Sequence, residues 1–205
     1  MDMQFTKTLR GSRGQSLVET LLTLPLLLIV CLNAMNFGYF VLMALNIVAA
    51  PHSGALYAIE GSSTPAAQPL PPSGSPSTPN SVSYLTYNEM TGAINNPTSA
   101  SIRVCTPINT AGSPPSGVNG TGASQKSNCV TCTSSSCGAV DNSGTNLDPD
   151  PEAPNFVLNR VEVTYTFTPL VNVPGFTIPL SWIPFCSGAN GNCTITRNAQ
   201  MRSMQ

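Results

Sequence analysis

A long apolar run near the N-terminus dominates the pattern of hydrophobic and polar positions. From Leu17 to about Ala50 the residues are largely Leu, Ile, Val, Ala, Met and Phe, and no Asp, Glu, Lys or Arg lies between Glu19 and Glu60. Roughly 20 apolar residues suffice for a helix to cross a bilayer. The run is longer than this, so we expect one membrane-crossing helix whose far end projects beyond the hydrocarbon. A cleaved secretory signal, with an apolar core of about 7–15 residues, does not fit this length.

The last third of the chain shows a period of two instead. Within "FVLNRVEVTYTFTPL" the apolar side chains alternate with polar ones, which predicts a strand with one buried face. The apolar set consists of Val161, Val163, Tyr165 and Phe167. A further strand is expected over Cys193–Met201, with "PGFTIPLSWIPF" in the connection. These strands predict a small antiparallel sheet packed beside the emergent end of the long helix.

The region between helix and strands has a different composition. Residues 61–154 contain thirteen prolines and much Ser, Thr, Asn and Gly, and such segments bury little apolar surface. We expect only a short helix at Tyr84–Ile94 and a strand at Ser101–Thr106 here. The expected fold class is α+β. It divides into a basic leader (1–14), the long helix (15–60), a low-complexity exported region (61–154) and C-terminal strands (155–205).

Charge is scarce and unevenly placed. Only 8% of residues are charged and the formal net charge is −1, against about 25% charged residues in an ordinary soluble domain. No basic patch is present to neutralise phosphates, so nucleic acid is not an expected partner. Three basic residues, Lys7, Arg10 and Arg13, precede the apolar run. They predict a cytoplasmic N-terminus, with the chain from about Pro51 onward outside the inner membrane.

One carboxylate, Glu19, lies just inside the leading edge of the apolar run. An ionisable group in a membrane-length stretch is costly and usually marks a function. Gly14 is followed by Gln15, and Glu19 is the fifth residue after Gly14. A short basic leader, a Gly before the cut and a Glu at the fifth mature position resemble the prepilin-peptidase site of type IV pilins.

The wider stretch over residues 10–60 is similar to the TadE-like pseudopilins (TadE/TadG family) of the tight-adherence, or Flp, pilus system. A weaker similarity returns over residues 160–202. The features that carry the resemblance are Arg13-Gly14-Gln15, Val18-Glu19, Leu24–Leu28, Phe37-Gly38, and Ala50 through Gly54-Ala55 to Tyr57-Ala58.

The resemblance implies a structural protein: a minor component or assembly factor of a tight-adherence type pilus or a related secretion apparatus. It would be single-pass in the bacterial inner membrane, surrounded by lipid, with its C-terminal domain periplasmic or extracellular or in the pilus. The implied partners are a prepilin peptidase, other pilins or pseudopilins, and the inner-membrane assembly platform with its ATPase. No cofactor is implied.

Two residues have implied roles in assembly. After cleavage, the new α-ammonium of Gln15 in one subunit would pair with Glu19 of another, compensating two otherwise expensive charges; the alternative is a Glu19 solvated near the headgroups. Pro25 removes a helical hydrogen bond and should kink the helix, although membrane helices also tolerate proline without such a role.

Six of the seven cysteines fall in the predicted exported part. An even number in an oxidising compartment favours disulfides, and six cysteines allow 15 pairings; Cys186–Cys193 is the easiest local bridge. Cys31 is expected to act as a small hydrophobe. The candidate disulfide cysteines are Cys105, Cys129, Cys132, Cys137, Cys186 and Cys193.

Other chemistry is weakly supported. "CVTCTSSSC" could hold a metal, but a second ligand pair at zinc-finger spacing is missing, and no thioredoxin-like context surrounds its CxxC. The acidic run "DPDPEAP" lacks the Gly turn of an EF-hand. The single histidine, His52, and the scattered acids form no catalytic constellation, so we expect no enzyme. The remaining alternative is an unprocessed membrane-anchored adhesin or binding protein with a disulfide-bonded exported domain.

Overall fold

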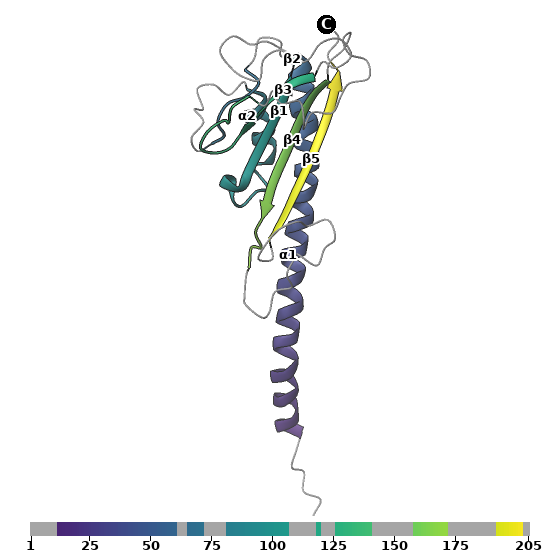
Figure 1. Ribbon diagram of the computed structural model, residues 1–205. Coiled ribbons are helices and arrows are strands. Elements are labelled where there is room, and N and C mark those ends of the chain that lie inside the picture. Colours follow the sequence, from purple (N-terminus) through teal and green to yellow (C-terminus); the bar gives the residue numbers. More distant parts are fainter. Residues whose placement is uncertain are drawn as a thin grey trace, which may run out of the picture.

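One long helix and one small sheet make up the structure, a computed structural model that describes residues 12–60, 65–71, 81–106, 118–119, 126–140, 158–171 and 192–202. Helix α1 (Ser12–Glu60) lies along one side of the sheet and extends well beyond it (Figure 1). The predicted α+β class, a long apolar helix with a small antiparallel sheet, is confirmed.

The sheet has the strand order β2-β3-β1-β4-β5, and each neighbouring pair is antiparallel. A short helix, α2 (Val82–Met90), and a 3-10 turn, η1 (Pro97–Ser99), precede it. The strands are β1 (Ala100–Thr106), β2 (Val118–Asn119), β3 (Lys126–Cys132), β4 (Leu158–Phe167) and β5 (Cys193–Arg202).

The core lies between α1 and the sheet. On β4 every second residue is buried, as the alternation of the sequence predicts. The buried face of β4 continues onto both neighbouring strands, because Val163 lies opposite Ile102 of β1 and Tyr165 lies opposite Ile195 of β5. Residues of α1 spaced three or four apart close the core from the other side: Asn36, Phe40, Met43, Ile47 and Ala50 are all buried. This spacing places one face of a helix against a neighbour.

Aromatic contacts fix the height of the sheet on the helix. The ring of Phe167, the last residue of β4, lies 5.4 Å from that of Phe40 in an edge-to-face arrangement and 5.6 Å from that of Tyr39. Such pairs contribute roughly 0.5–1.5 kcal/mol beyond their buried area. The end of β4 is therefore held at the level of Tyr39 and Phe40.

Helix α2 covers the remaining side of the core. Its N-cap is Ser81, whose hydroxyl accepts a hydrogen bond from the backbone N–H of Tyr84 at 3.1 Å. This cap starts the helix at Val82, two residues before the predicted start. The helix ends at Met90, where Ala93 N–H bonds back to the Met90 carbonyl in a turn. The predicted strands over 101–106 and 193–201 are present, each within one residue of its predicted ends.

Strand β3 was not predicted. Its sequence, "KSNCVTC", is mostly polar and lies in the region of low complexity. Its buried hydrophobic residues are Cys129, Val130 and Cys132, and both cysteines form disulfides. Cross-linking and pairing with β1, rather than a hydrophobic alternation, thus hold this strand in the sheet.

Gly54 marks the closest approach of α1 to its neighbours. A Cβ at this position would lie 2.0 Å from Thr86 Oγ1 of α2 and 3.3 Å from Val161 Cγ1 of β4. At Gly38, on the same helix, a Cβ would have no neighbour within 4 Å.

We predict that Gly54→Ala lowers the stability of the domain. Overpacking costs roughly 1–3 kcal/mol, which exceeds the roughly 1 kcal/mol that Ala gains over Gly inside a helix. The measurement is the Tm of the full-length protein in detergent micelles. Gly38→Ala is the matched control and should not lower Tm. Adding Thr86→Ala to Gly54→Ala should recover part of the loss; a Tm of Gly54→Ala at or above the wild-type value would contradict this account of the packing.

Candidate assembly surface on the long helix

The N-terminal part of α1 has no sheet beside it. We call Leu17–Met35 the protruding segment; nearly all of its large apolar side chains are exposed, among them Leu21 and Leu22 at 70% each. At 1.5 Å per residue its 19 residues span about 28 Å, close to the roughly 30 Å hydrocarbon thickness of a bilayer. Length and composition make α1 a candidate membrane span. Exposed leucines along a whole segment require a non-aqueous partner.

The predicted processing residues lie at the start of this helix. The helix begins at Ser12, so the backbones of Gly14 and Gln15 are helical. Glu19 is exposed, and its backbone carbonyl accepts a hydrogen bond from the Thr23 hydroxyl at 2.9 Å. Among the described residues, Glu19 forms no ion pair, whereas Arg160 is paired with Glu162 on β4. The Glu19 carboxylate is therefore available to another molecule.

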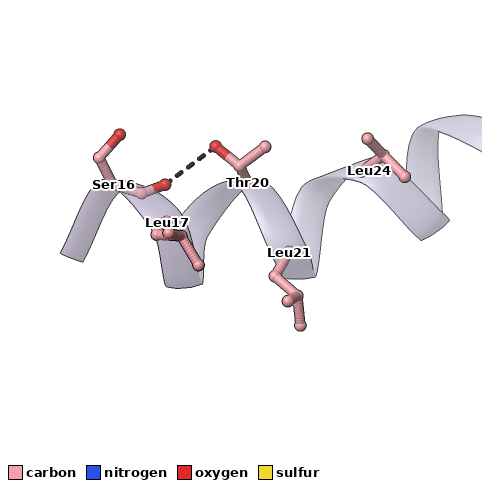
Figure 2. A pocket seen from close by; sticks show the side chains of 5 residues that line it. All are labelled: Ser16, Leu17, Thr20, Leu21 and Leu24. Atoms are coloured by element: carbon pink, nitrogen blue, oxygen red, sulfur yellow. Dashed lines mark hydrogen bonds between the residues drawn. The ribbon is translucent and has the colours of Figure 1, made fainter. Parts of the chain in front are cut away.

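Figure 2 shows the side chains that line an open hollow near the start of α1, and all of the described lining residues belong to this one helix. The Thr20 hydroxyl bonds back to the Ser16 carbonyl at 2.9 Å, so this polar group is satisfied within the helix. Because no second element among the described residues adds a wall, the hollow lies open along the helix and does not enclose a small ligand. It is a shape against which another helix or a lipid chain can pack. The lining residues are Ser16, Leu17, Thr20, Leu21 and Leu24.

Pro25 lies within the protruding segment. Helix α1 continues past Pro25, and also past the buried Pro51, as one element. The bend that the sequence suggests at Pro25 stays a prediction.

A second apolar surface lies above the protruding segment, on the side of α1 that faces away from the sheet. We call it the upper stripe, and it was missed in the sequence. Its members are spaced four, four and three residues apart, which places them on one side of a helix. They are Phe37 (57% exposed), Val41 (41%), Leu45 (67%) and Val48 (44%). The core residues of α1 have a similar spacing. The sequence pattern therefore does not separate the core face of the helix from the exposed upper stripe.

Polar groups fasten the boundary between the two parts of α1. The buried side chain of Asn36 donates from Nδ2 to the Val171 carbonyl at 2.8 Å and accepts from the Val171 N–H at 3.1 Å. Tyr39 donates to the Ala93 carbonyl at 2.6 Å, and Tyr165 donates to Asn95 Oδ1 at 2.8 Å. Burial raises the pKa of the Tyr165 phenol, so Tyr165 remains a neutral donor at ordinary pH.

The predicted disulfide bonds are present. Cys105 of β1 pairs with Cys129, which lies directly opposite it on β3, and Cys132 pairs with Cys137. Cys193 is also disulfide-bonded, whereas its predicted partner, Cys186, lies outside the described residues. Cys31, on the protruding segment, is exposed and not disulfide-bonded.

The three cysteines of "CVTCTSSSC" are therefore all in disulfides, which leaves no thiolate there for a metal or for redox chemistry. Within the part of the chain that the structure describes, no group of three or more His, Cys, Asp or Glu side chains could hold a metal ion. The acidic residues Asp148, Asp150 and Glu152 lie outside that part. His52 is exposed on α1.

Comparisons with known proteins add no assignment. The chain matches no protein-family model, no curated protein and no solved structure. The residues of α1, and the resemblance that they carry, are therefore the features that bear on function.

Proposed function

We propose that this chain is a TadE-like pseudopilin: a structural minor component or assembly factor of a tight-adherence type pilus or a related secretion apparatus. The observation that carries the proposal is Glu19, an exposed carboxylate near the start of a membrane-length apolar helix, five residues after Gly14. A prepilin peptidase would cut between Gly14 and Gln15. Other pilins or pseudopilins, and the assembly platform with its ATPase, would be the further partners.

The charge pattern supports a role for Glu19 between molecules. A carboxylate near the hydrocarbon is costly when it has no partner, and no described residue of the same chain pairs with it. The new α-ammonium of Gln15 in a neighbouring subunit would supply the missing charge. Glu19 would then set the register in which subunits dock.

The upper stripe supports a neighbouring protein rather than lipid alone. The exposed apolar side of α1 continues from Leu17 to Val48, which is about 48 Å at 1.5 Å per residue. Hydrocarbon covers only roughly 30 Å of that length. The turns of the stripe from Val41 to Val48 need another apolar surface, and a neighbouring pilin helix in the same membrane runs in the right direction to provide it.

The proposed location is the bacterial inner membrane. Lys7, Arg10 and Arg13 precede the apolar helix, which favours a cytoplasmic N-terminus. Disulfide bonds persist in oxidising compartments, and those of this chain lie in the domain beyond the helix. Both features favour an exported domain on the far side of the membrane.

We predict that the mature protein begins at Gln15. Gly14 lacks a side chain, so a peptidase can hold its backbone close to the catalytic groups, and Gly14→Val should leave the leader in place. The measurement is the intact mass and N-terminal sequence of protein extracted from its native membrane. Gly11→Val is the matched control, because it makes the same change three residues earlier and should leave the cut unchanged.

A wild-type protein that begins at Met1 would contradict processing and favour the membrane-anchored adhesin or binding protein instead. A start at Gln15 with the residue cyclised to pyroglutamate would support processing. It would also remove the ammonium, and with it the proposed charge pair.

We also predict that Glu19→Gln disrupts contacts between subunits. Removing one partner of a buried charge pair costs roughly 3–5 kcal/mol, so the assembled fraction should fall by more than about tenfold. The measurement is the yield of cross-linked products from a photoreactive amino acid placed at Leu45 on the upper stripe. Glu60→Gln is the matched control, since Glu60 is an exposed glutamate at the other end of α1. Equal yields from the two variants would contradict a docking role for Glu19.

A further inference from the structure

The lower end of the sheet domain, where β4 ends and β5 begins, lies beside the top of the protruding segment (Figure 1). Phe167 of β4 and Cys193 of β5 are paired residues, so the chain leaves β4 and returns to β5 at the same end of the sheet. We call this end, with Phe37, Leu170 and Val171, the domain base. Two hydrogen bonds join Val171 to Asn36. Asn36 directly follows Met35, the last residue of the protruding segment, so the domain base lies at the end of that segment.

Burial on α1 extends below the domain base. Ile29, Leu32 and Asn33 are partly buried, although they belong to the segment that has the length of a membrane span. They lie on the same side of the helix as Asn36, since their spacing follows the helical repeat. This side of α1 is therefore partly buried over about two turns, while the other sides of the helix are exposed.

Two large apolar side chains are exposed among the described residues of the domain base. Leu170 is 52% exposed and Phe37 is 57% exposed. Leu170 adjoins Val171 and Phe37 adjoins Asn36; we call the two hydrogen bonds between Asn36 and Val171 the Asn36 clamp. The polar groups that join this level are neutral: Asn95 Nδ2 donates to the Thr168 carbonyl at 3.0 Å, and Tyr39 donates to the Ala93 carbonyl. In the sequence, no Asp, Glu, Lys or Arg occurs between Glu162 and Arg197.

These features match the requirements of a membrane interface. Amphipathic aromatic side chains such as Tyr favour the headgroup level, and apolar side chains favour the boundary of headgroups and acyl chains when no charge must be desolvated with them. If the hydrocarbon begins at Leu17, a span of roughly 20 residues ends at Asn36. The domain base would then face the outer headgroup region directly.

We propose that the domain base is a second lipid-binding surface, through which Leu170 and Phe37 enter the outer interface of the bilayer and seat the domain on it. This inference rests on the proposed membrane anchoring of α1. It adds that the domain stands on the membrane without a stalk, in one orientation set by α1 and the base together. The occupant is phospholipid at the boundary of headgroups and acyl chains.

The test is the depth of spin labels in vesicles of phosphatidylcholine and phosphatidylglycerol. Cys31 offers a native thiol for one label. In a Cys31→Ala background, Leu170→Cys and Phe37→Cys place labels at the base. Asn198→Cys places a control label at an exposed position of β5 away from the base. Collisions with oxygen, which concentrates in lipid, are compared with collisions with a polar nickel chelate, which stays in water. Cys31→Ala alone should take up no label.

The expected oxygen-to-nickel ratio at residues 170 and 37 lies between that at Cys31 and that at residue 198, and several-fold above the latter. Ratios at 170 and 37 equal to that at 198, with Cys31 in lipid, would overturn the second contact and leave the anchor intact. A water-exposed Cys31 would overturn the anchor itself, and the lipid-seated base with it. Measuring two base positions protects the test against a substitution that perturbs the local fold.

Discussion

The packing of Phe167 against Tyr39 and Phe40 fixes where the sheet sits on the long helix, and the rest of the structure depends on that height. Above it, α1 supplies one wall of the hydrophobic core. Below it, the same helix is apolar and largely bare. The Asn36 clamp lies at the change between these two surroundings. One continuous helix therefore has to satisfy a protein core along one part and a non-aqueous environment along another.

This division explains why the helix is apolar for so many residues. A membrane span alone needs roughly 20 residues. Of the further apolar residues, some form the core face and others form the upper stripe. In the proposed function, both of these sets of apolar residues have a role. The core face carries the disulfide-bearing domain; under the proposal, the upper stripe would contact a neighbouring subunit, and Glu19 at the other end of the helix would set the docking register.

Much of the fold could be predicted from periodicity. The alternation of Val161, Val163, Tyr165 and Phe167 gave β4 and its buried face, because a half-buried strand imposes a period of two. Strand β3 could not be predicted in this way, since its burial comes from Cys129 and Cys132 and their disulfides rather than from an apolar repeat. Likewise, six cysteines do not specify their pairing. The Cys105–Cys129 bridge requires the register of β1 and β3, which depends on contacts far apart in sequence.

For the candidate assembly surface, the charged residue could be recognised in the sequence, whereas the apolar surfaces could not. Gly14, Gln15 and Glu19 stand out in the sequence because a charge in an apolar run is costly, while the structure adds only that Glu19 is exposed and that the backbone there is helical. The upper stripe and the Asn36 clamp emerge only from the structure. Leu45 and Ile47 look alike in the sequence, yet one is 67% exposed and the other is fully buried. Which of two apolar residues faces the core depends on where the sheet docks.

The most direct test of one helix in two environments is thiol accessibility along α1 in right-side-out spheroplasts. A membrane-impermeant maleimide is applied to the wild-type protein, in which Cys31 is the free thiol among the described residues. It is also applied to Ser53→Cys in a Cys31→Ala background, since Ser53 is exposed beside the domain. We expect rapid labelling at residue 53 in intact spheroplasts and no labelling of Cys31 until detergent dissolves the membrane. Equal labelling at both positions, or labelling at residue 53 only after lysis, would contradict this expectation.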